Sequence, residues 1–136
     1  MEGKLPFEAL IRKRPVSLQA KGASKKDWQD FVRGEVVKAW GDAPPVQAVS
    51  LRFSLVYLCN DSPPDADNII KPIQDALNGL VFEDDGLVSD VDSHRRFISE
   101  GIEVSCLPPL LREGVAGGGE CVYIRVSLAQ ALETYL

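Results

Sequence analysis

Residues 61–92 hold nine acidic residues and a single basic one, and this imbalance is the first sign of chemistry in the chain. Like charges about 4 Å apart repel by roughly 4 kcal/mol at an effective dielectric near 20, so acids on a protein surface are usually mixed with bases. A hard divalent cation such as Mg²⁺ would offset the repulsion, because it prefers carboxylate oxygens and keeps water positions open for chemistry. The sequence therefore predicts a metal site within this segment. Its one base is Lys71, and its acids are Asp61, Asp65, Asp67, Asp75, Glu83, Asp84, Asp85, Asp90 and Asp92.

The acids form two clusters around one predicted helix. Asp65 and Asp67 precede a helix expected from about Asn68 to Asn78, and Glu83, Asp84 and Asp85 follow the turn at Gly79. Helical spacing puts one set of side chains toward the core and another on the opposite stripe. The core set is Ile69, Ile70, Ile73, Ala76, Leu77 and Leu80, and the polar stripe is Asn68, Lys71, Asp75 and Asn78.

A simpler interpretation of these acids stays open. Asp65 and Asp67 would also suit the amino terminus of a helix, where the helix dipole favours acids, and the second cluster would suit a solvated turn. Other Asp-x-Asp motifs do not fit, since a calcium-binding loop needs a ligand and then Gly where Ile69 and Ile70 stand. The chain offers neither a nucleophile–histidine pair nor a glycine-rich phosphate loop.

The remaining patterns predict a small single α/β (α+β) domain over residues 1–136, with a mixed sheet packed by two main helices. We expect strands at 7–12, 46–60, 87–99 and 120–128, the last ones hairpin-like. A helix is expected from Ser24 to about Trp40, because its apolar residues recur at a helical period. Pro108-Pro109 and 114–119 predict a mobile loop. The apolar residues expected on the first helix are Trp28, Phe31, Val32, Val36, Ala39 and Trp40.

Composition and charge narrow the function classes. No apolar run approaches the roughly 20 residues that span a bilayer and the start lacks an apolar signal region, so we expect a cytoplasmic protein without a membrane partner. Three cysteines without close spacing predict reduced thiols. The net charge of −5 argues against a nucleic-acid partner, but residues 1–40 carry nine bases against five acids and predict a separate positive face.

The segment from Pro64 to Asp85 resembles the signature of RusA-type Holliday junction resolvases. The matching features are the Asp-x-Asp-Asn run at 65–68, Lys71 three residues after its Asn, Asp-Ala-Leu at 75–77, and a paired acid about one helix further on. The resemblance extends more weakly over most of the chain. It includes Arg14-Pro15-Val16-Ser17 after the first strand, the helix that contains Trp28, and Val88.

The resemblance implies a Mg²⁺-dependent endodeoxyribonuclease, with Mn²⁺ as a substitute metal. Such an enzyme resolves four-way DNA junctions by paired symmetric nicks in recombination and repair, and works as a homodimer. Asp65, Asp67 and Asp85 match the catalytic, metal-binding aspartates, and Lys71 matches the catalytic helix lysine. Asp75 and Asp84 match supporting acids. Arg95 stands near a position where the family often has Lys, and Pro64 stands where a base commonly precedes the first Asp.

The sequence also leaves an alternative function open and offers candidate residues for contacts with DNA. The alternative is a non-catalytic module that binds branched DNA or a protein and retains the metal site. Lys71 also has a second reading, as a simple ion pair with Asp75 at i+4. The candidates for contacts with DNA phosphates are Arg12, Lys13, Arg14, Lys25, Lys26, Arg95 and Arg96.

Overall fold

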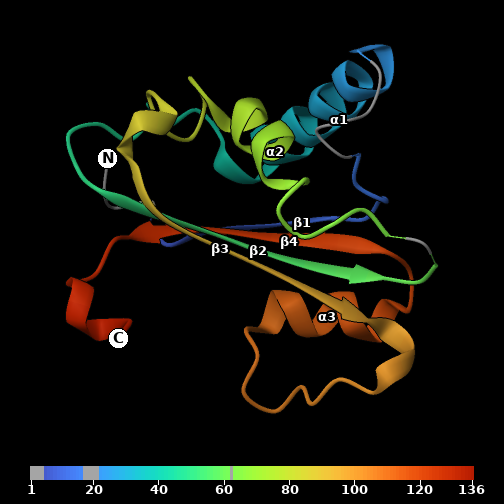
Figure 1. Cartoon of the computed structure of the whole chain (residues 1–136). Helices are drawn as coiled ribbons and strands as arrows, with labels where there is room; N and C mark the ends of the chain where they lie inside the picture. Colours follow the sequence, from blue (N-terminus) through green and yellow to red (C-terminus); the bar gives the residue numbers. More distant parts are fainter. Residues whose placement is uncertain (1–4, 17–21, 62) are drawn as a thin grey trace.

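A four-stranded mixed sheet separates two helices on one face from a third helix on the other (Figure 1). The computed structural model describes residues 5–16, 22–61 and 63–136. The strands are β1 (Phe7–Ile11), β2 (Leu51–Cys59), β3 (Val88–Phe97) and β4 (Cys121–Leu128), in the spatial order β1-β4-β2-β3. β4 is antiparallel to both β1 and β2, whereas β2 and β3 are parallel. The predicted mixed sheet is confirmed, but the last two strands form no hairpin, because β2 lies between them.

Strand β2 sets the two faces of the sheet. Leu51, Phe53, Leu55 and Tyr57 are fully buried on the face that α1 and α2 cover, and the residues between them point to the other face. The strand is shorter than the predicted 46–60. Ala48 has a left-handed φ of 60°, which breaks the extended conformation. The segment before it pairs elsewhere, and Val46 bridges to Phe82 near the second acidic cluster.

Helix α1 (Gly22–Trp40) and helix α2 (Ile70–Leu77) pack side by side on the first face. In α1, Trp28, Val32, Val36 and Trp40 are buried as predicted. The expectation was wrong for Phe31, which is 37% exposed, and for Ala39, which is exposed. Both lie at the margin of the apolar stripe. The ring of Phe31 stacks on Trp28. Lys13 Nζ lies over the Phe31 ring, 4.6 Å from its centroid.

Helix α3 (Pro109–Gly117) replaces the predicted mobile loop, so three helices pack on the sheet instead of two main ones. Pro109 occupies the first helical position, where the missing N–H costs nothing, and Gly118 ends the helix with a left-handed φ of 72°. Leu111 and Gly114 are buried against the sheet. A Cβ at Gly114 would lie 3.1 Å from Cys121 Sγ, so glycine permits the close approach. None of the described helices is long and apolar enough to cross a membrane.

Candidate functional site

The turn that carries the first acidic pair is fastened to strand β3. Ser93 Oγ donates a hydrogen bond of 2.7 Å to the Ala66 carbonyl, and Arg95 Nη1 donates one of 3.3 Å to the Pro64 carbonyl. Within the turn, the Asn68 amide donates to the Asp65 carbonyl at 3.0 Å. The Asp65 side chain is 75% exposed, and its Oδ1 lies 3.6 Å from Arg95 Nη1.

Helix α2 begins at Ile70, and neither acid of the first pair caps it. Its N-cap residue is Ile69, with no side-chain hydrogen bond at the cap. Asp67 is exposed, and no hydrogen bond or ion pair joins its carboxylate to the described residues. The helix-capping interpretation of these acids is therefore wrong, and their carboxylates remain open to solvent.

The second acidic cluster forms a short 3-10 turn, η2 (Asp85–Leu87). Asp84 caps this turn, because its carboxylate accepts a hydrogen bond of 2.9 Å from the Gly86 amide. A Cβ at position 86 would lie only 2.6 Å from Asp84 Oδ2, so any other residue there would displace the capping carboxylate. Asp84 thus stabilises the turn that carries Asp85.

Lys71 of α2 pairs with one acid of its own helix and one acid of the second cluster. Its Nζ lies 2.8 Å from Asp85 Oδ2 and 2.9 Å from Asp75 Oδ1. The hydrogen bond to Asp85, followed by the one to Asp75, raises the pKa of Lys71, and the same bond lowers the pKa of Asp85. Lys71 therefore stays protonated and Asp85 ionised. The predicted i+4 pair with Asp75 is present, but Lys71 serves both carboxylates at once.

Helix α1 holds the other end of α2. Arg33 Nη1 donates hydrogen bonds of 3.0 Å to the carbonyls of Ala76 and Asn78, which end the helix. A cation suits this place, because the carboxyl end of a helix is its negative end. Asn78 in turn helps to lower the pKa of Asp85. Sequence reasoning missed Arg33, and only its position on the face of α1 toward α2 could have indicated this contact.

The donor chemistry of these acids fits a hard divalent cation, because exposed carboxylates are the ligands that Mg²⁺ takes. Their side chains do not form a ready-made cage. Among the described residues, no three His, Cys, Asp or Glu side chains converge closely enough to hold a metal ion. Asp85 and Asp75 share the ammonium of Lys71, whereas Asp65 faces Arg95. The structure thus brings Asp85, Asp75 and Lys71 together and leaves Asp65 and Asp67 apart from them.

Most of the predicted DNA-contacting bases have partners within the chain. Arg14 Nη1 donates to the Asp61 carbonyl at 2.8 Å and to Glu120 Oε2 at 3.1 Å, so it lies at the start of the acidic segment. Arg12 pairs with Glu113 at 3.8 Å, and Lys26 pairs with Asp30 at 3.2 Å. Arg96 Nη1 donates to a backbone carbonyl, and Lys25 also interacts within the chain.

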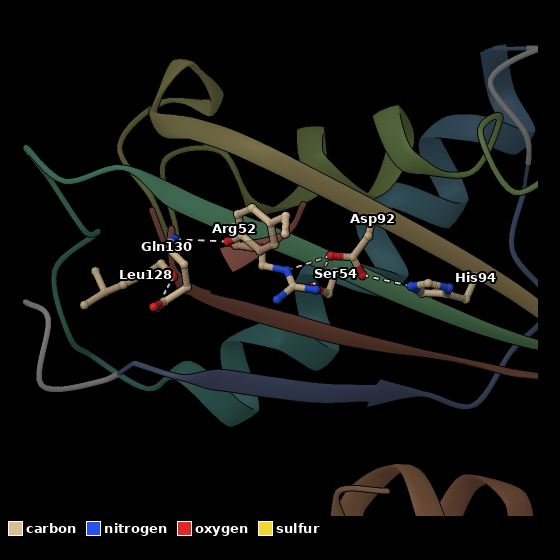
Figure 2. Close-up of polar contacts among 7 residues, drawn as sticks. Arg52, Ser54, Asp92, His94, Leu128 and Gln130 are labelled. Carbon is tan, nitrogen blue, oxygen red and sulfur yellow. Dashed lines mark hydrogen bonds and ion pairs between the residues drawn. The ribbon is translucent and has the colours of Figure 1, made fainter. Parts of the chain in front are cut away.

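The opposite face of the sheet carries a separate polar network (Figure 2). Asp92 accepts hydrogen bonds from Arg52 Nε at 2.7 Å and from Ser54 Oγ at 2.9 Å, and its Oδ1 lies 3.1 Å from His94 Nε2. The Arg52 guanidinium lies over the ring of Tyr135, 5.2 Å from its centroid. A cavity of about 560 Å³ opens beside these residues. Asp92 is one of the nine acids between residues 61 and 92, but its carboxylate lies on the face away from α2.

Comparison with protein families gives one match. A family model described as endodeoxyribonuclease RusA matches residues 19–106, more than half of the chain. The matched range includes α1, β2, α2 and β3, and therefore both acidic clusters and Lys71. A comparison with curated proteins finds no match.

Proposed function

The chain belongs to the RusA family of endodeoxyribonucleases, and on this premise we propose that it is a metal-dependent enzyme that cuts four-way DNA junctions. We place its active centre at the Asp65–Asp67 turn, Lys71 and Asp85. The two symmetric nicks of a resolved junction would serve DNA recombination and repair.

The observation that carries this proposal is the shared ion pair of Lys71. Two carboxylates from different segments turn toward one cation, and each remains partly exposed. An ion pair between exposed groups contributes at most about 1 kcal/mol, so stability alone gives little reason to gather these charges. A centre for phosphodiester hydrolysis needs this combination, since acids can bind a metal and a fixed ammonium can stabilise charge on the phosphate.

Asp65, Asp67 and Asp85 are the residues that would hold Mg²⁺, with Mn²⁺ as an alternative, and the exposed side chains of Asp65 and Asp67 would have to turn toward Asp85 to do so. When bound, such an ion polarises the phosphate and lowers the pKa of a water molecule. Lys71 keeps its proton because of its two carboxylate partners, so it can stabilise negative charge on a non-bridging phosphate oxygen. Asp75 holds the ammonium from the helix side, and Asp84 fixes the turn that presents Asp85.

The proposed assembly is a homodimer. A four-way junction has two-fold symmetry, whereas one chain carries a single copy of the acidic constellation. A two-fold dimer would supply two equivalent centres through one self-complementary interface.

Incubation of the protein with a synthetic four-way junction and with the matching linear duplex tests the proposal. We expect nicks in two opposite strands of the junction with Mg²⁺, and none with EDTA or with Ca²⁺. The duplex should stay intact under all conditions. Tight junction binding without nicks in Mg²⁺ or Mn²⁺ would contradict the proposal and favour the non-catalytic binding module.

A further inference from the structure

Two side chains of β3 grip the backbone of the turn that bears Asp65 and Asp67. Ser93 and Arg95 are two residues apart, so they point to the same face of the sheet. Their hydrogen bonds end on the carbonyls of Ala66 and Pro64, on either side of Asp65. We infer that Ser93 and Arg95 are positioning residues that hold the acidic turn in its working conformation. This inference rests on the proposed function of that turn.

Pairing with the buried strand β2 determines where these two side chains of β3 lie. In the parallel ladder of β2 and β3, Ser93 is paired with Leu55 and Arg95 with Tyr57. Leu55 and Tyr57 are fully buried beneath the helices, so this stretch of β2 cannot shift without disturbing the core. The two hydrogen bonds therefore tie an exposed turn to the edge strand β3, which is itself paired along its length with the buried strand β2.

The two bonds restrain the turn at closely spaced points. Fixing the carbonyls of residues 64 and 66 restricts the peptide groups between them, and the bond from the Asn68 amide to the Asp65 carbonyl closes the turn. Pro63 and Pro64 precede it and have restricted φ angles of their own. The backbone conformation sets the directions of the Asp65 and Asp67 side chains, and misplacing a reacting group by about 1 Å can cost about 100-fold in rate.

The Arg95 side chain is held mainly by contacts within the protein. Its side chain is 32% exposed, and its guanidinium lies 5.8 Å from the centroid of the Phe97 ring. The distance of 3.6 Å to Asp65 Oδ1 is long for a hydrogen bond, so the carboxylate keeps its capacity to bind other groups. Arg95 thus offers a positive charge beside Asp65 without blocking it. These contacts favour a positioning role over the predicted contact with DNA phosphates.

The alternate residues of β3 provide a matched control. Asp92 and His94 flank Ser93 in sequence, but they point to the opposite face, where Asp92 bonds to His94, Arg52 and Ser54 (Figure 2). His94 is exposed and makes no described contact with the acidic turn. His94→Ala therefore disturbs the same strand while leaving the grip on the turn intact.

The first test follows backbone hydrogen exchange and needs no nuclease activity. We expect Ser93→Ala and Arg95→Ala to speed exchange of the Asn68 amide by about tenfold or more, with the amides of β2 unchanged. Ser93→Thr retains the hydroxyl and should restore slow exchange, and His94→Ala should leave the Asn68 amide as in the wild type. Equal effects of Ser93→Ala and His94→Ala, or faster exchange across the whole sheet, would overturn the inference.

The second test separates rate from affinity on a four-way junction in Mg²⁺. Loss of a supporting contact commonly costs 10- to 100-fold in activity, so we expect kcat to fall by about that factor in Ser93→Ala and Arg95→Ala. KM should change by less than about threefold. A raised KM with unchanged kcat in Arg95→Ala would overturn the inference for Arg95 and make it a phosphate contact. If the wild type cuts no junction, the proposed function fails, whereas the exchange result still decides the grip on the turn.

Discussion

Lys71 Nζ lies 2.8 Å from Asp85 Oδ2, although the two residues are 14 positions apart in the chain. The contact joins helix α2 to the turn η2 and leaves both side chains partly open to solvent. It brings together one acid from the second cluster and the only base between residues 61 and 92. The proposed chemistry depends on this pair, and the first prediction concerns its lysine.

Replacing Lys71 should affect turnover far more than affinity. If its ammonium stabilises charge that develops in the transition state, Lys71→Ala should lower the single-turnover rate by about 100-fold or more and change junction binding by a small factor. Lys71→Arg keeps the charge and should recover part of the rate. Single-turnover cleavage and binding titrations measure the two effects. An equal loss of rate and affinity would instead identify an ordinary phosphate contact.

Removing one negative charge from the acidic turn should not destabilise the metal-free protein. Asp67 is exposed and has no described partner, so Asp67→Asn should leave the free energy of unfolding equal to or above that of the wild type. Asp85→Asn loses its ion pair with Lys71 and should cost at most about 1 kcal/mol. Thermal unfolding in EDTA provides the measurement. A clear loss of stability in Asp67→Asn would mean that this acid is structural.

Because of Asp92 on the opposite face of the sheet, the free energy of unfolding should depend on pH in the acidic range. Burial acts to raise the pKa of Asp92, but hydrogen bonds from Arg52 and Ser54 outweigh it, and the net pKa is lowered. A lowered folded-state pKa contributes stability above the unfolded value near 4, and this contribution is lost as pH falls through the folded value. Asp92→Asn should therefore cost about 1–2 kcal/mol at pH 7 and progressively less below about pH 4. Urea unfolding at several pH values measures this, and a deficit independent of pH would contradict it.

The protein should sediment as a homodimer at micromolar concentration. The expected mass is twice the 14.9 kDa of one chain, because paired nicks need two equivalent centres. Sedimentation should be run with and without junction DNA. A strict monomer under both conditions would leave a nicking enzyme or a binding module, and would exclude the paired-nick mechanism.

Local patterns predicted the parts of the fold that local forces decide. Alternation identified the core of β2, and the helical period identified the buried residues of α1 and α2. Helix α3 was missed because Pro109 and Gly118, which look like loop residues, are its first residue and its end cap. The placement of β4 between β1 and β2 depends on long-range pairing, which no sequence spacing reveals.

In the candidate site too, local spacing predicted some contacts, and others appear only in the folded structure. Spacing along one helix predicted that Lys71 would meet Asp75, but only the fold shows that η2 brings Asp85 to the same ammonium. The contact of Ser93 with Ala66 crosses 27 positions, and nothing about an isolated serine in a strand indicates it. Arg95 stands where the resemblance led us to expect a DNA contact, yet its partners are Pro64 and Asp65.

The cleavage rate of Asp67→Asn on a four-way junction in Mg²⁺ tests the central claim most directly. The substitution removes one charge from an exposed side chain without a described partner, so the fold and Lys71 should be unaffected. If Asp67 belongs to a metal-dependent nuclease centre, cleavage should fall below detection while the melting temperature and junction binding stay close to those of the wild type. Wild-type cleavage by this variant would contradict the assignment of the acidic turn as the active centre.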